Sequence, residues 1–380
     1  MNASLVRSPK ARRQRRLGLL LIAGAAATLS LLLVAAAGAK PIVFGVKGVV
    51  TRIAADGSRV ALEVTKKGSC DRVIAWNATS KAFTGWTTGA CGATPLSGVP
   101  EVAIGGTTVG WIEAGGGNNQ ELTFNAATIG KAAVKKSVLF VTNGNGAGGD
   151  KTGEYIGHLF GNGSALALNQ WTVCHSLAPG AVDEESMAIC KTPGVAGTDA
   201  YLVDSPVLKT YSGGAVKSVV SNGHTYQVSA VNNGRIAVAF ETGQVPIYSL
   251  AGALQTTIPI PAGTVSGAAL YGDQYFTIRN GALEVYSMTA LVKSIPITAS
   301  KPNLRAATDK YAVYVSGSSV HVVRISDGKD ITLSTGGTPG APADGMITSS
   351  GLFYASNVMT NKTAPGRVTF IPAAAIAGLF

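Results

Sequence analysis

Three consecutive segments of similar length and pattern lie between residues 231 and 334. They begin at Arg235, Gln274 and Tyr311, so their period is about 38 residues. Each segment holds short runs in which apolar and polar residues alternate, as they do in half-buried β-strands. A period of this length built from short strands is typical of a repeat array, in which each unit buries its faces only against its neighbours.

Similar runs extend this pattern over the rest of the chain. Repeats that start near 59, 108, 164, 235, 274, 311 and 351 predict an all-β fold, a β-propeller with seven blades of four antiparallel strands. The unit between Ala165 and Arg235 is overlong and holds either an insertion or an extra blade, so six or eight blades are alternatives. The last unit lacks a clear fourth strand, and an open sheet edge leaves backbone groups unpaired. We therefore expect PIVFGV (41–46) to complete the last blade and close the ring of a single domain, 40–380.

Two segments carry a resemblance to a known repeat family. ADGSRVAL (55–62) resembles the turn and strand of bacterial, secreted WD40-like and TolB-type propeller repeats, and RISDGKDITL (324–333) is similar to the later part of the same repeat. The resemblance covers two of the units and implies a propeller fold. The Trp-Asp and Gly-His pairs of eukaryotic WD40 repeats are absent, so the resemblance implies no activity.

Residues 1–39 have the composition of an export signal. Six Arg and Lys residues between Arg7 and Arg16 precede an uncharged run, rich in Ala and Leu, from Leu17 to Ala39. The run ends in Ala37-Gly38-Ala39, a small-x-small cleavage pattern. Its 23 residues are also enough to span a bilayer as a helix. We expect a signal peptide that is cleaved after Ala39 or, alternatively, an uncleaved signal-anchor. Export would follow either the Sec or the twin-arginine route.

Both alternatives make residues 40–380 extracytoplasmic, either secreted or anchored to the outer face of the cytoplasmic membrane. Contact with the membrane is then limited to residues 17–39 of an uncleaved leader. Of the 31 Lys and Arg residues, six lie in the leader, so 25 face 20 Asp and Glu in the exported part, a net charge of +5. This modest charge, without a basic helix or a basic and aromatic strand face, argues against nucleic-acid binding. We expect a monomer.

The four cysteines all lie in the exported part. Cys70 and Cys91 are close in the sequence, as are Cys174 and Cys190, so two local disulfides are the most economical of the three connectivities. Each would contribute about 3 kcal/mol by restricting the unfolded chain. No Cys-x-x-Cys or paired His accompanies either couple, and we therefore expect no bound metal and no cofactor.

The densest polar group comprises His175, Asp183, Glu184 and Glu185, inside the second cysteine loop. It is a weak candidate for a cation or ligand site, and an ordinary solvated acidic turn is the favoured interpretation because the spacing of a calcium loop is missing. No nucleophile elbow and no repeated carboxylate pair is found. The sequence therefore predicts a non-catalytic scaffold that binds a protein or an envelope polymer. The alternative is a secreted polysaccharide hydrolase or lyase with carboxylates at the central channel.

Overall fold

The structure is a computed structural model that describes residues 40–66, 68–91, 98–117, 119–144, 152–176, 200–220, 227–239, 243–261, 265–333, 337–359 and 365–380. The predicted leader, 1–39, lies outside the described residues. In the described part, no helix is long and apolar enough to cross a membrane. The only helical turns described are α2 (Ala373–Ile376) and the 3-10 turn η2 (Ala377–Leu379).

The described chain is otherwise built of β-strands. They follow one another as β1 (Ile42–Lys47), β2 (Val49–Asp56), β3 (Arg59–Thr65), β4 (Cys70–Asn77), β5 (Phe83–Cys91), β6 (Gly98–Gly105), β7 (Thr108–Gly116), β8 (Gln120–Thr128), β9 (Val134–Asn143), β10 (Gly153–Asn162), β11 (Ala165–Ser176), β12 (Ala200–Ser212), β13 (Ala215–Val220), β14 (Gln227–Asn232), β15 (Arg235–Ala239), β16 (Gln244–Ser249), β17 (Leu254–Pro259), β18 (Val265–Tyr271), β19 (Gln274–Arg279), β20 (Ala282–Ser287), β21 (Leu291–Pro296), β22 (Asn303–Ala307), β23 (Tyr311–Ser316), β24 (Ser319–Arg324), β25 (Asp330–Thr332), β26 (Asp344–Thr348), β27 (Gly351–Asn357) and β28 (Pro365–Pro372).

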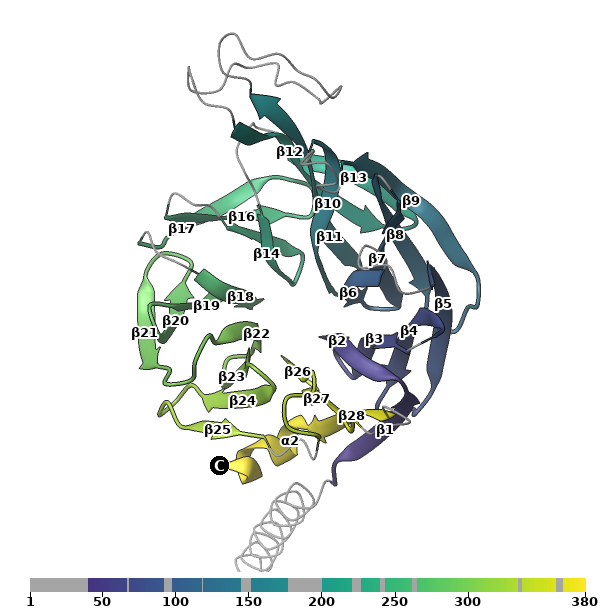
Figure 1. Ribbon diagram of the computed structural model, residues 1–380. Coiled ribbons are helices and arrows are strands. Elements are labelled where there is room, and N and C mark those ends of the chain that lie inside the picture. Colours follow the sequence, from purple (N-terminus) through teal and green to yellow (C-terminus); the bar gives the residue numbers. More distant parts are fainter. Residues whose placement is uncertain are drawn as a thin grey trace, which may run out of the picture.

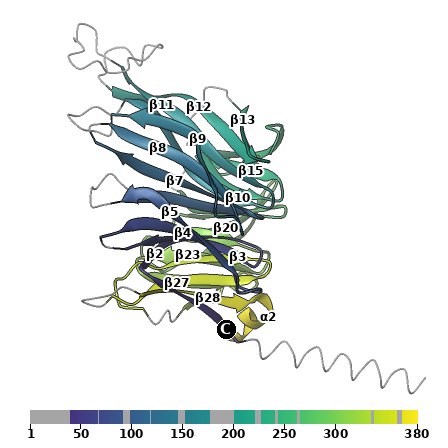
Figure 2. The same ribbon diagram turned by 90° about the vertical axis from the view of Figure 1, so that its right-hand side faces the viewer.

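These strands form antiparallel runs of four. The sheets β2–β5 and β14–β17 stand alone, whereas β6–β13 and β18–β25 are counted as eight-stranded sheets. Each eight-stranded sheet is two runs of four joined by a single residue pair, Asn143 with Gly153 in one and Gly267 with Leu304 in the other. Figure 1 shows the runs arranged around a ring, with the first strand of each beside the axis. Figure 2 shows the ring from the side, with α2 near one edge. This arrangement is that of a β-propeller.

The last sheet combines the two ends of the described chain. β1 pairs antiparallel with β28 over six residues, from Ile42 opposite Phe370 to Lys47 opposite Pro365, which gives the order β1-β28-β27-β26. This is the sheet to which the sequence analysis assigned PIVFGV. Without β1, the outer edge of β28 would present unpaired backbone groups to the solvent.

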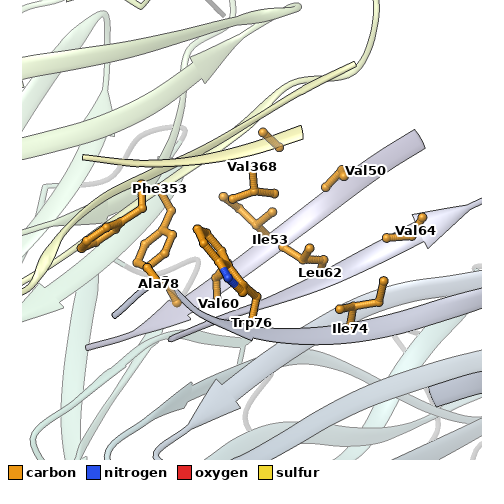
Figure 3. Close-up of a cluster of buried hydrophobic side chains, with 13 residues drawn as sticks. Val50, Ile53, Val60, Leu62, Val64, Ile74, Trp76, Ala78, Phe353 and Val368 are labelled. Atoms are coloured by element: carbon orange, nitrogen blue, oxygen red, sulfur yellow. The ribbon is translucent and has the colours of Figure 1, made fainter. Parts of the chain in front are cut away.

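The core lies between neighbouring sheets. In one cluster, Val50, Leu62 and Trp76 of β2–β4 pack against Phe353 and Val368 of β27 and β28 (Figure 3). A fully buried side chain of this kind contributes roughly 1.5–3 kcal/mol. Because the alternating residues of each strand face two different neighbours, one four-stranded sheet needs a sheet on each side to bury both of its faces.

The repeats are real, but their expected phase was wrong. Each predicted start falls, within one residue, on the second strand of a run, and the first strands β10, β14, β18 and β22 were missed; the second strands begin at Arg59, Thr108, Ala165, Arg235, Gln274, Tyr311 and Gly351. The first strands surround the axis, where neighbouring sheets converge and leave room only for small side chains. Segments such as GAAL (267–270) and RAA (305–307) consequently lack the β-branched and aromatic residues that mark a strand in a sequence.

The overlong third unit forms one four-stranded run in the described residues, not an extra blade. β10–β13 occupy it, and its surplus length is due to the long strands β11 and β12 and to residues 177–199 between them. β12 alone spans 13 residues. Residues 177–199 lie outside the described part of the chain.

Candidate binding site at the central channel

The first strands of the runs supply the walls of the central channel. Their side chains are mostly small or apolar, and charged or titratable residues interrupt them along the channel, among them Arg52, Glu101, His158, Arg305 and Asp344. In the described residues, β2, β6, β10, β14, β18 and β22 each show a register shift against the second strand. A β-bulge redirects the side chain beside it. The bulges therefore explain how side chains of strands that line a narrow channel come to face one another.

Glu101 links β6 to the bulge of β10. Its carboxylate accepts hydrogen bonds from the backbone N–H of His158, at 2.9 Å, and of Leu159. His158 has a φ of +54°, and the register of β10 shifts between Gly157 and Phe160. The bulge releases both N–H groups from the ladder, and the carboxylate satisfies them. Glu101 thus acts as a bridge between two neighbouring strands of the channel wall.

Asp344 connects three channel strands. Its carboxylate accepts hydrogen bonds from the backbone N–H of Ile53 on β2 and from that of the next residue, Gly345, each at 2.9 Å. Arg305 on β22 donates to it through Nε and Nη2, each at 2.8 Å. This fork geometry is the strongest form of an arginine–carboxylate pair. The negative charge of Asp344 raises the pKa of Arg305 above its ordinary value, so the guanidinium stays charged.

The opposite end of the channel is fastened through the turns between first and second strands. Asp56 accepts the backbone N–H of Gly106, at 2.6 Å, and of Gly163, at 2.9 Å. Asn162 accepts the N–H of Asn233 at 3.1 Å, which continues the chain of turns. Gly106 has a φ of +59°, and a Cβ there would lie 2.4 Å from the carbonyl oxygen of Gly163, so only glycine fits this close approach.

Three cavities follow the channel. One of about 410 Å³ lies at the end fastened by Asp56, and one of about 220 Å³ lies farther along and is lined by Arg52, Glu101, His158 and Arg305. Burial lowers the pKa of His158, against the opposing effect of the Glu101 charge, which favours a neutral imidazole. The side chain lies beside Trp171, with ring centroids 5.7 Å apart.

The third cavity, of about 320 Å³, lies where β2, β22 and β26 begin. Arg52, Lys301 and Arg305 line it, and we call these three residues the cationic mouth. Arg52 and Lys301 are exposed and make no hydrogen bond or close ion pair with the described residues. Arg305 is held by Asp344 but keeps 28% of its side chain exposed. The mouth therefore presents positive charge that the described protein does not neutralise.

The residues proposed from the sequence lie elsewhere or outside the described part. His175 is near the end of β11, opposite Tyr201 on β12, whereas Asp183, Glu184, Glu185 and Cys190 are not among the described residues. The Cys70–Cys91 disulfide is confirmed, and Cys174 also takes part in a disulfide. Within the described ranges, no group of three His, Cys, Asp or Glu side chains could hold a metal ion.

The four tryptophans were expected to pack in the core. Trp76, Trp86 and Trp111 are buried, with at most 3% of each exposed, and Trp171 stacks on Tyr155. None of them lines the cationic mouth.

Sequence reasoning did not single out the channel residues, and the strands β10 and β22, which carry His158 and Arg305, were not recognised. A signal was nevertheless present in the sequence. Arg305 directly precedes Ala306 and Ala307, and Arg52 lies two residues before the pair Ala54 and Ala55. A charged residue inside a short run of small residues marks a strand that lies beside an open polar channel.

No known protein-family model matches the chain, and no curated protein matches it. Similar solved structures include β-propellers. The Swd1 β-propeller domain of Myceliophteria thermophila is 9% identical, with a TM-score of 0.48, and the match covers 87% of this chain and 100% of that one. BamB from Moraxella catarrhalis is 12% identical, with a TM-score of 0.41, over 85% and 84% of the two chains. The β-propeller domain of the Trilobed protease from Pyrococcus furiosus is 13% identical, with a TM-score of 0.37, over 79% and 98%.

The class of protein follows from the strand pairing itself. Antiparallel runs of four strands around a common axis define a β-propeller. The expected resemblance to propeller repeat proteins is thereby confirmed at the level of the fold.

Proposed function

We propose that this protein is an exported, non-catalytic β-propeller that binds a partner protein at the cationic mouth of its channel. The observation that carries this proposal is the contrast between the charges of the channel. Its carboxylates are occupied by backbone N–H groups and by Arg305, whereas Arg52 and Lys301 have no close partner in the described residues. Charge that a protein does not neutralise internally is available to a ligand.

The same contrast favours a scaffold over a hydrolase or lyase. Glycoside hydrolysis needs one carboxyl group that donates a proton and a second that acts as base or nucleophile. Asp56, Glu101 and Asp344 each accept at least two hydrogen bonds that hold neighbouring strands or turns together. Protonating any of them would break those bonds, so their role is to fix the channel wall.

We further infer that the ring has seven blades and that β1 closes it. Support comes from the runs of four strands, which begin at β2, β6, β10, β14, β18, β22 and β26, and from the pairing of β1 with β28. Closure of this kind joins the first and last strands of the ring by backbone hydrogen bonds, so that the repeat array has no free end.

The extracytoplasmic location is part of the proposal. The basic and apolar leader supports it, and so does the Cys70–Cys91 disulfide, because structural disulfides persist in oxidising compartments. Fractionation of the source organism tests it directly. We expect the full chain, or the chain shortened by the leader, in the envelope or the medium, and recovery from the cytoplasm would contradict export.

Site-specific photo-crosslinking in the source organism tests the binding site. A benzoylphenylalanine at Asn303, which is exposed in the same cavity as the cationic mouth, is compared with one at Lys217 on the exposed edge strand β13. We expect a discrete protein adduct from Asn303 that Lys217 does not give. Equal adducts from both positions, or none from Asn303, would contradict partner binding at the mouth.

A further inference from the structure

The cationic mouth has an excess of positive charge that the structure leaves uncompensated. Three cationic side chains line its cavity, and Asp344 is the one carboxylate among the described residues that line it. Asp344 is matched by Arg305, so Arg52 and Lys301 have no carboxylate to match them within the cavity; Glu63, which acts on Arg52 from β3, does not line the cavity and has a raised pKa. Exposed like charges in one cavity repel each other, and an anionic ligand relieves this repulsion.

The mouth is also preorganised. The fork between Arg305 and Asp344 fixes the guanidinium, and the backbone N–H groups of Ile53 and Gly345 fix the carboxylate in turn. Arg305 donates to Asp344 through Nε and Nη2, so its Nη1 remains as a donor beside the cavity. A donor that is already fixed loses little conformational entropy when a ligand binds.

The size and lining of the cavity narrow the class of ligand. A cavity of about 320 Å³ accommodates one acidic side chain with part of its backbone, and it is too small to hold an extended stretch of a polymer. No aromatic ring lines it, so a sugar ring would find no stacking surface. The exported part carries a net charge of only +5, which does not provide the extended basic track that a nucleic acid needs.

We infer that the cationic mouth binds the carboxylate groups of an acidic peptide segment, contributed by the partner protein. This inference rests on the proposed function and specifies its ligand. Arginine suits this role because its planar donors match a carboxylate in geometry. Arg52 and Lys301 would then attract the segment, and Arg305 would orient one of its side chains beside Asp344.

Fluorescence anisotropy of a labelled octaglutamate peptide tests the inference on the full-length protein. Arg52→Gln and Lys301→Gln remove the two uncompensated charges, and Lys217→Gln is a matched control with the same change of charge on β13. We expect each mouth variant to weaken binding about fivefold, the double variant to weaken it further, and the control to leave it unchanged. Binding should also fall as sodium chloride rises.

Further probes separate the ligand classes. Lys301→Glu should lower the affinity for octaglutamate more than Lys301→Gln does, whereas a loss of folding would affect both alike and is checked by circular dichroism. Equal binding of octaglutamine would overturn the inference. So would tighter binding of polygalacturonate or inorganic phosphate at a matched concentration of charge, because either would assign the mouth to a sugar or a phosphate ligand.

The two proposals fail in different ways. If the Asn303 adduct forms but octaglutamate does not bind, the scaffold function stands and the acidic peptide is the wrong ligand. If octaglutamate binds only in a manner insensitive to Arg52→Gln and Lys301→Gln, the mouth is not its site and the inference is overturned.

Discussion

Glu63 offers a sharp test of the electrostatics beside the channel. It lies on β3 with 6% of its surface exposed, and burial raises its pKa to about 7. The negative charge of Asp71 adds to this rise, and the positive charge of Arg52 opposes it. The neighbouring carboxyl of Asp71 also has a raised pKa, because it too is partly desolvated. The protein therefore holds a proton on Glu63 that the unfolded chain would release in mildly acidic solution.

The sign of the effect on stability follows from this difference. Between pH 4.5 and about 7 the unfolded chain loses the proton while the folded protein keeps it, so the free energy of unfolding falls as pH rises. At about 1.4 kcal/mol per pH unit the total fall approaches 3 kcal/mol. Glu63→Gln keeps the shape of the side chain and removes the titration. We expect the variant to match the wild type near pH 4.5 and to exceed its stability by about 3 kcal/mol near pH 8.

Urea unfolding followed by tryptophan fluorescence, repeated across this pH range, measures the difference. Glu121→Gln on β8 is the matched control, because it makes the same chemical change at an exposed glutamate of a strand. A Glu63→Gln variant that is equally or less stable than the wild type at both ends of the range would refute the reasoning. It would mean that the carboxylate is solvated or paired in the folded protein.

Three further changes test links between strands, within one sheet or between two. Glu101→Ala removes the acceptor for two backbone N–H groups and should lower the free energy of unfolding, measured in urea, by about 2–4 kcal/mol. A loss below about 0.5 kcal/mol would contradict the role of Glu101 as a link between β6 and β10. Replacing both Cys70 and Cys91 by Ser should cost about 3 kcal/mol, and adding a reductant should then affect the variant less than the wild type. Phe44→Ala removes a ring whose centroid lies 5.2 Å from that of Trp76 and should lower the free energy of unfolding by about 2 kcal/mol. Val43→Ala is the control, because Val43 is exposed on the same strand and its truncation should leave the stability unchanged. Equal effects of the two substitutions would argue against a specific contact of β1.

The parts of the fold that the sequence predicts are those where burial imposes alternation. The second and third strands of each run are packed on both faces, and their Val, Ile, Leu and aromatic residues make them recognisable. The place of PIVFGV was predicted by a different argument, that an apolar strand at one end and a missing strand at the other complement each other, and β1 does pair with β28. Four first strands, β10, β14, β18 and β22, escaped both arguments. GAAL (267–270) could equally belong to a helix or a loop, and only the ring explains why such small residues form strands.

The candidate site was unpredictable for a related reason. Arg52 precedes Lys301 and Arg305 by some 250 residues, so no spacing rule connects it with them. They meet because the ring brings β2 and β22 to the same cavity, on either side of β26. The loop around His175 attracted attention because its polar residues are adjacent in the sequence. In a ring of repeats, adjacency in the sequence is a poor guide to a site, since the axis gathers residues from every blade.

The direction of β1 relates the mouth to the leader. Lys47, at the end of β1, lies opposite Pro365, whereas the start of β1 at Ile42 lies level with Phe370, Phe353 and Met346 through successive pairings. The chain therefore reaches β1 from the end of the ring where β26 finishes, and the mouth lies where β26 begins. An uncleaved leader would tether the propeller by that far end. The mouth would then face away from the membrane, where it could receive a segment of another protein. The turns around Asp56 would lie at the end of the ring that faces the anchor.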